Sequence, residues 1–249
     1  MTYLSHPINF ALATNQLHTW VLYFDVLEEK KTFLKKFLSQ DEIIKASKFR
    51  FDKDKNCSII TRGALRLLSG MYLNMSPENI IFKYGDYGKP DFEMETELKF
   101  NVSHSGNMAI IGFVLNKDIG VDIEKIKYDF EVMDIVDNYF SQLEIESLKK
   151  LPVQEHNQGF YRCWTRKESF IKAKSQGLSF ALDSFSVSLD SDDKAQLLET
   201  HWNPDEKESW RLFSFSPDTD YLGGVTVQST IEQIEYFNFN SYLNKLSNS

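Results

Sequence analysis

Residues 108 to 124 read MAIIGFVLNKDIGVDIE, and this segment decides the predicted fold. Two runs rich in β-branched and apolar side chains, Asn107–Leu115 and Ile119–Glu124, are each typical of a β-strand. The polar residues Asn116–Asp118 separate them and are typical of a connector. The segment therefore predicts two consecutive, mostly apolar strands in the middle of the chain.

The second strand carries two acidic side chains on one face. Alternate side chains of a strand share a face, so Val121 and Ile123 point to one side and Asp122 and Glu124 point to the other. Two carboxylates about 7 Å apart on an otherwise apolar strand repel each other. The arrangement is stable either at a solvated face or with a cation between the carboxylates, and the strand alone does not distinguish the two.

A third carboxylate lies on a predicted helix, Phe160–Lys174, which contains the run WTRKESFIK at residues 164 to 172. Glu168 and Lys172 are four residues apart and share a face, and Trp164 one turn earlier places Glu168 at the edge of the buried stripe. The pair is either an ordinary helix ion pair or part of a site that faces a cleft. Three carboxylates suit Mg²⁺, which prefers oxygen ligands, whereas His, Cys and Asp do not cluster at zinc spacing.

Helices and strands recur in a similar order in the two halves of the chain. The other predicted strands are Leu17–Val26, Ile80–Tyr84, Phe100–Val102, Phe185–Leu189, Trp210–Ser216 and Tyr221–Val227. The other predicted helices lie within Glu28–Phe51, Ser58–Leu73 and Tyr139–Leu151, with Pro152 and Gly159 before the helix of Glu168. This order predicts two similar α+β lobes, residues 1–116 and 117–235, with a cleft between them and a weakly specified tail at 236–249.

The composition is that of a globular protein: 42% of the 249 residues are hydrophobic. No apolar run approaches the roughly 20 residues of a membrane span, and the N-terminus has no signal-peptide pattern. The two cysteines, Cys57 and Cys163, suit a reducing compartment. We therefore expect a cytoplasmic protein with no membrane partner.

The charge is unevenly distributed. The net charge of −8 argues against nucleic-acid binding, yet Lys30–Arg66 contains eleven basic and four acidic residues, a local balance of +7. Such a stretch is either a solvated helix face or a place where an anionic, phosphate-rich ligand binds.

Four motifs together resemble the Sfp-type phosphopantetheinyl transferase family: GKP at 88–90, FNVSHSG at 100–106, IGVD at 119–122 and WTRKESFIK at 164–172. They occur in the family's order and spacing, between about residues 49 and 189. The resemblance implies an α+β fold of two lobes related by a pseudo-two-fold axis, with coenzyme A and Mg²⁺ in the cleft between the lobes. It also implies transfer of 4'-phosphopantetheine from coenzyme A to a serine of an acyl, peptidyl or aryl carrier protein, as in nonribosomal peptide or polyketide biosynthesis, with release of 3',5'-ADP.

The same resemblance implies roles for individual residues. Asp122, Glu124 and Glu168 would hold Mg²⁺ on the pyrophosphate of coenzyme A. Lys172 would contact the same phosphates, and Glu168 is the candidate base that activates the carrier serine.

The cofactor-binding residues implied by the family are Lys45, Ser58, Arg66, Lys89, Ser103 and His104, the last two at the 3'-phosphate. Two positions depart from the family. Cys57 stands where the family commonly has arginine, and Glu42 stands where a lysine can occur. Both departures predict weaker phosphate contacts on the N-terminal lobe.

Two other functions share much of this site chemistry. One is a Mg²⁺-dependent hydrolase of a nucleotide pyrophosphate, and the other is a non-catalytic module that binds carrier proteins. The presence of all three carboxylates favours the transferase. In this family the segment Asp129–Leu151 contacts the carrier, and the pseudo-two-fold fold implies a monomer.

Overall fold

The computed structural model describes residues 1–4, 10–177, 180–228 and 231–246. Residues 108–125 form two strands as predicted, β5 (Met108–Leu115) and β6 (Ile119–Lys125). Asn116, at the start of the connector, has a φ of 52°, a left-handed conformation that asparagine adopts more readily than most residues. The two strands do not pair with each other but lie in different sheets.

The first sheet has the strand order β11 (Gln233–Asn238), β1 (Gln16–Tyr23), β5 and β4 (Leu98–Ser105). Its pairs are antiparallel except that β11 runs parallel to β1. The second sheet is antiparallel, with the order β6, β10 (Tyr221–Gln228) and β9 (Trp210–Phe215). The mixed α+β character predicted from the sequence is thus confirmed.

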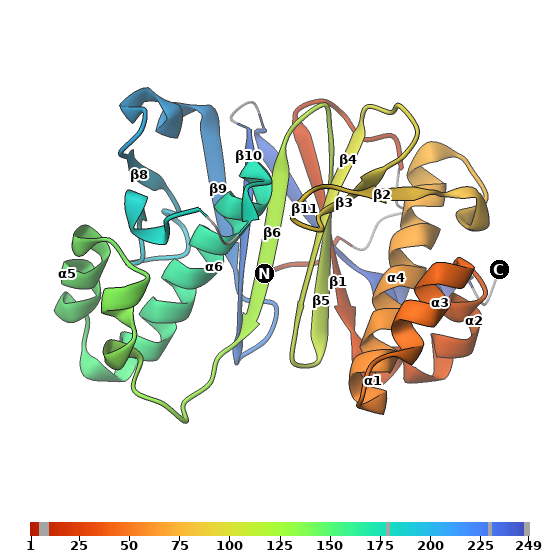
Figure 1. Cartoon of the computed structure of the whole chain (residues 1–249), viewed down its shortest axis with the longest axis horizontal. Coiled ribbons are helices and arrows are strands. Elements are labelled where there is room, and N and C mark those ends of the chain that lie inside the picture. Colours follow the sequence, from red (N-terminus) through yellow and green to blue (C-terminus); the bar gives the residue numbers. More distant parts are fainter. Residues whose placement is uncertain (5–9, 178–179, 229–230, 247–249) are drawn as a thin grey trace.

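The sheets pack against each other, and each has a long helix on its outer face (Figure 1). Along β1, Trp20 and Leu22 belong to a core shared with α4 (Asp52–Leu73), whereas Leu17 and Val21 belong to a core between the sheets. Val121 of β6 lies in the same intersheet core. The opposite face of β6 and β10 is covered by α6 (His156–Lys174).

The remaining elements surround this frame. The helices are α1 (Phe24–Leu27), α2 (Lys31–Lys35), α3 (Gln40–Ser47), α5 (Gln142–Lys150) and α7 (Phe239–Leu246). Two hairpins are formed by β2 (Phe82–Tyr84) with β3 (Pro90–Phe92) and by β7 (Phe185–Val187) with β8 (Leu197–Thr200). Within the described ranges no helix is both long and apolar enough to cross a membrane.

Several element boundaries differ from the predictions: β1 ends at Tyr23, not Val26, and α5 begins at Gln142, not Tyr139. Helix α4 begins six residues before Ser58, because its first turns are polar and exposed and so lack an apolar pattern. The prediction that Gly159 separates two helices is wrong, since α6 already begins at His156. A Cβ at Gly159 would lie 2.6 Å from Leu151 and 2.8 Å from Leu148, so this glycine allows close packing on α5.

The segment after Tyr236, weakly specified by the sequence, is ordered up to residue 246 in β11 and α7. Phe237 stacks on Trp20 with a centroid distance of 4.8 Å, and Phe239 is fully buried nearby. The end of the described chain therefore completes the core of the first sheet.

Helix α6 lies unusually close to β6. A Cβ at Gly120 would be 1.9 Å from the carbonyl oxygen of Ser169 and 2.4 Å from the amide nitrogen of Ala173. A Cβ at Gly224 on β10 would be 2.7 Å from the carbonyl oxygen of Thr165. Gly120, Asp122 and Glu124 are alternate residues of β6 and therefore share one face. Since Gly120 lies against α6, the acidic face of this strand is turned toward α6.

The substitution Gly120→Ala is expected to lower the free energy of unfolding by about 2–3 kcal/mol, because the new methyl group overlaps the backbone of α6. Urea denaturation of the purified chain measures this loss. Gly85→Ala is the matched control, since its nearest neighbour would be a carbonyl oxygen at 3.9 Å. Equal stabilities of the two variants would contradict the close approach of α6 to β6.

Candidate active site

One lysine links the two elements that carry the predicted carboxylates. The ammonium of Lys172 on α6 donates to Asp122 Oδ1 on β6 at 2.6 Å and to Ser103 Oγ on β4 at 3.1 Å. Ser103 Oγ also donates to Asp122 Oδ1 at 2.9 Å. The Asp122 side chain is almost fully buried, whereas that of Lys172 is 30% exposed. The network thus extends from the interior to the protein surface.

A second serine on β4 repeats this contact one step along the strand. Ser105 Oγ donates to Glu124 Oε2 at 2.6 Å. Ser103 and Ser105 share a face of β4, and this face meets the acidic face of β6. No role was predicted for Ser105, although alternation within the FNVSHSG motif places it on the same face of β4 as Ser103.

The carboxylates have more acceptor capacity than the surrounding residues satisfy. Among the described residues, the buried atoms Asp122 Oδ2 and Glu168 Oε1 have no hydrogen-bond partner. Burial raises the pKa of Glu168 from its ordinary value of 4.5 to about 6, with a further increase from Asp122 and Glu124 and a decrease from Lys172. Burial also raises the pKa of Glu124, and Asp122 adds to that shift. Both shifts arise mainly from the removal of the carboxylates from water, and the neighbouring carboxylates add to them.

The donor set fits a hard divalent cation in its chemistry, because it consists of carboxylate oxygens of which two lack partners. The side chains do not yet surround a common point. In the part of the chain that the structure describes, no three His, Cys, Asp or Glu side chains are grouped closely enough to hold a metal ion. Binding of a cation would thus require small side-chain movements, beginning with the Lys172–Asp122 contact.

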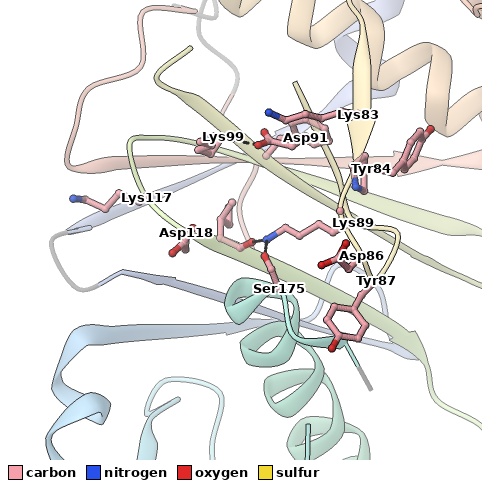
Figure 2. A pocket seen from close by; sticks show the side chains of 14 residues that line it. Lys83, Tyr84, Asp86, Tyr87, Lys89, Asp91, Lys99, Lys117, Asp118 and Ser175 are labelled. Carbon is pink, nitrogen blue, oxygen red and sulfur yellow. Dashed lines mark hydrogen bonds and ion pairs between the residues drawn. The ribbon is translucent and has the colours of Figure 1, made fainter. Parts of the chain in front are cut away.

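Lys89 fastens the C-terminal end of α6 to the rest of the site. Its ammonium donates to the carbonyl oxygens of Ile119 and Lys172, at 2.9 Å and 2.6 Å. It also donates to Ser175 Oγ at 3.1 Å, as Figure 2 shows. Burial lowers the pKa of Lys89 to about 8. An ammonium has three donors, and all three are used within the protein. In this structure Lys89 therefore positions α6 and has no donor left for a ligand.

A cavity of about 380 Å³ brings together three of the predicted cofactor residues. Lys45 on α3, Ser58 on α4 and His104 on β4 all line it. Burial lowers the pKa of His104, and the nearby charge of Lys172 lowers it further, which favours the neutral imidazole. Ser103 is next to His104 in sequence but points to the other face of β4, toward Asp122.

A neighbouring cavity of about 440 Å³ is lined by Lys89, Glu168 and Lys172. Pro90 and Val102 line both cavities, so the two adjoin. Together they form a continuous surface from Glu168 and Lys172 of α6 to the basic residues of α3 and α4.

Arg66 lies apart from the other predicted cofactor residues. It is 3% exposed, and its guanidinium donates to Glu42 Oε2 at 2.6 Å and to the carbonyl oxygens of Ile80 and Pro77 at 2.7 Å and 3.1 Å. Glu42 also accepts a hydrogen bond from the backbone of Ser39, as part of the capping box of α3. The structure thus places Arg66 in the packing of α3 and α4, in contrast to the cofactor contact predicted for it.

The fold and the site together define an α+β protein in which a cluster of carboxylates and a lysine adjoins a partly basic cavity. Comparison with known proteins gives this class a family. A family model described as the 4'-phosphopantetheinyl transferase superfamily matches residues 118–226. A model described as the N-terminal part of 4'-phosphopantetheinyl transferase matches residues 26–114.

Individual relatives agree with both matches. The chain is 30% identical to the 4'-phosphopantetheinyl transferase HetI of a Nostoc species over 91% of this chain and 93% of that protein. It is 33% identical to the 4'-phosphopantetheinyl transferase Sfp of Bacillus subtilis over 68% of this chain and 74% of that protein. The chain belongs to the Sfp-type 4'-phosphopantetheinyl transferase family, as its motifs predicted.

The raised pKa of Glu168 has a consequence for stability. The native state retains its proton between pH 4.5 and about 6, where the unfolded state has lost it, so Glu168 makes the protein less stable as the pH rises through this window. Glu168→Gln removes this effect. The free energy of unfolding of the variant minus that of the unsubstituted protein should therefore be about 1–2 kcal/mol larger at pH 7 than at pH 4.5.

Urea denaturation at the two pH values, in the presence of a chelator, measures this difference. Glu146→Gln, at an exposed position of α5, is the matched control. A Glu168→Gln effect that does not change with pH would contradict the raised pKa.

Proposed function

We propose that this chain transfers the 4'-phosphopantetheine moiety of coenzyme A to the acceptor serine of an acyl or peptidyl carrier protein, in a Mg²⁺-dependent reaction that releases 3',5'-ADP. Its membership of the family supports the reaction class. The observation that carries the proposal is the contact of Lys172 with Asp122 beside two carboxylate oxygens, on Asp122 and Glu168, that have no partner among the described residues.

Coenzyme A is proposed to occupy both adjoining cavities. The pyrophosphate would lie beside Lys172 and Glu168, and the 3'-phosphate would lie beside Lys45, Ser58 and His104. The shared residues Pro90 and Val102 support this assignment, because one extended ligand must pass from one cavity to the other. The combined size suits a ligand of this kind, since small-molecule sites commonly measure about 300–1,000 Å³.

Asp122, Glu124 and Glu168 are the proposed ligands of Mg²⁺, which when bound neutralises negative charge on the pyrophosphate. The ammonium of Lys172 would release Asp122 and contact the same phosphates. It then stabilises the charge that develops on the oxygen between the two phosphorus atoms as the bond to the β-phosphorus breaks.

The carrier serine becomes nucleophilic only when its proton is removed. Glu168 is proposed to accept this proton, directly or through a water molecule. The serine oxygen forms a bond to the β-phosphorus, and the bond from that phosphorus to the bridging oxygen breaks. The electron pair of the broken bond leaves with 3',5'-ADP.

The finer architecture is part of the same proposal. Residues 1–116 and 117–235 would form two lobes related by a pseudo-two-fold axis, and the presence of one sheet with one long helix in each half supports this. We also propose that the chain is a monomer. In the segment Asp129–Leu151, Phe130 and Tyr139 are exposed and available to a carrier protein, whereas Val132 and Phe140 are buried core residues.

Intact-mass spectrometry of an apo carrier protein incubated with this chain, coenzyme A and Mg²⁺ tests the proposal. We expect a mass gain of one phosphopantetheine group, which is lost with EDTA and with Asp122→Ala. No gain with either acyl or peptidyl carriers would contradict transfer. Release of 3',5'-ADP in that case would indicate a hydrolase, and its absence would indicate a non-catalytic carrier-binding module.

A further inference from the structure

Strand β4 joins the two sheets through its side chains. It is an edge strand of the first sheet, and β6 is an edge strand of the second. Edge strands carry backbone donors that need partners outside their own sheet. Two donors of β6 find such partners on β4. The Val121 amide donates to Asn101 Oδ1 at 2.8 Å, and the Lys125 amide donates to Ser105 Oγ at 3.2 Å. The joint between the sheets therefore depends on side chains of β4.

Ser105 connects this joint to the acidic face of β6. The hydroxyl that accepts from the Lys125 amide also donates to Glu124 Oε2 at 2.6 Å. A serine hydroxyl has one proton to donate and lone pairs to accept with, so both contacts can form together. Because they involve consecutive residues of β6, they fix the hydroxyl in one orientation, and the hydroxyl in turn fixes the Glu124 carboxylate.

The turn that follows Ser105 is held from the second sheet by Tyr221 on β10. The Tyr221 hydroxyl accepts a hydrogen bond from the Asn107 amide at 2.8 Å, and the residue is 6% exposed. A Cβ at Gly106 would lie 2.5 Å from the same oxygen and 3.3 Å from Cβ of Lys125. Gly106 has a φ of 59°, which glycine adopts without steric cost. The Tyr221 hydroxyl therefore determines how closely the turn approaches the second sheet.

Asn107 also ties the turn to the first sheet. Its carbonyl oxygen accepts from the Phe24 amide at 3.0 Å, and its side-chain amide donates to Asp25 Oδ2 at 2.6 Å. The turn is thus held on both sides, with the Tyr221 hydroxyl as its contact with β10. Since Ser105 directly precedes the turn, a change in this contact should be felt at Ser105.

We propose that Tyr221 and Ser105 are positioning residues of the candidate site. Tyr221 holds the β4–β5 turn, and the turn places Ser105 so that its hydroxyl fixes the Glu124 carboxylate for cation binding. The role of Glu124 as a cation ligand rests on the proposed function. Carboxylates that bind metal ions are themselves hydrogen-bonded, and loss of such a partner typically lowers metal affinity about 10–100-fold.

Titration of the full chain with Mn²⁺ in the presence of coenzyme A tests the proposal without a carrier protein or turnover. The electron paramagnetic resonance signal of free Mn²⁺ reports binding. Ser105→Ala should weaken Mn²⁺ binding about tenfold to a hundredfold. Tyr221→Phe removes one oxygen atom and should weaken it about threefold to tenfold, as expected for one neutral hydrogen bond. Ser105→Thr keeps the hydroxyl and should bind Mn²⁺ within about threefold of the unsubstituted chain.

The double variant tests whether Tyr221 acts through Ser105. In the Ser105→Ala background, Tyr221→Phe should weaken Mn²⁺ binding by no more than about twofold, because the hydroxyl that it positions is already absent. Both single variants should leave the affinity for coenzyme A in EDTA within about twofold. Equal losses of affinity for coenzyme A and for Mn²⁺ would overturn the proposal, since the turn would then act on the whole site.

Amide hydrogen exchange of the metal-free chain, followed by NMR, tests the link independently of the proposed function. Tyr221→Phe should speed exchange of the Asn107 amide, which loses its acceptor, and of the Lys125 amide, whose acceptor Ser105 moves with the turn. Tyr23→Phe is the matched control, because its hydroxyl packs beside the same intersheet core but donates to the carbonyl oxygen of Pro217 at 3.1 Å. It should change neither amide nor Mn²⁺ binding. Thermal melting of each variant reports on folding.

The proposal is overturned if folded Ser105→Ala and Tyr221→Phe variants bind Mn²⁺ as the unsubstituted chain does. It is also overturned if the Lys125 amide does not respond to Tyr221→Phe. Absence of Mn²⁺ binding by the unsubstituted chain would contradict the cation site of the proposed function, whereas a response of the Lys125 amide in the same protein would still support the link from Tyr221 to Ser105. Carrier modification and Mn²⁺ binding that are equal in all variants would contradict the positioning role alone.

Discussion

The site depends on the close approach of α6 to the second sheet. Glycines at positions 120 and 224 leave the backbone of the helix in near contact with β6 and β10, and Ser169 and Thr226 hydrogen-bond across the same seam at 2.7 Å. Because α6 lies so close to β6, Lys172 reaches Asp122 directly. The other side of α6 is held by Lys167, which is completely buried and contacts both carboxylate oxygens of Glu144 at 2.7 Å. The helix that carries Glu168 is therefore fixed from both sides.

This packing separates two kinds of charge along one surface. Three carboxylates face a single lysine at the β6–α6 junction, which leaves negative charge there. Burial, and to a lesser degree this charge, raises the pKa of Glu168 and Glu124. At the α3–α4 end, two arginines share one glutamate, which leaves positive charge. The proposed ligand, coenzyme A, would complement this pattern with its pyrophosphate at one end and its 3'-phosphate at the other. The protein's net charge of −8 conceals this local pattern.

Sequence patterns predicted the parts of the site that depend on local geometry. Alternation along β6 placed Asp122 and Glu124 on one face, and helical spacing placed Glu168 and Lys172 together, as the structure confirms. The burial of Arg66 could not be predicted, because it depends on Glu42 in a different helix. The order of the C-terminal segment was missed for a similar reason: β11 is a strand only by virtue of its parallel pairing with β1, more than two hundred residues away.

Asp122, Glu124 and Glu168 are proposed to form one cation site across the β6–α6 junction. Crystals grown with coenzyme A and Mn²⁺, which scatters anomalously and takes oxygen ligands as Mg²⁺ does, would reveal such a site. We expect an anomalous peak bonded to Asp122 and Glu168, with Lys172 moved from Asp122 to a phosphate oxygen. A peak held by other residues, or coenzyme A bound with the Lys172–Asp122 contact unchanged and no metal beside it, would rule out this cation site.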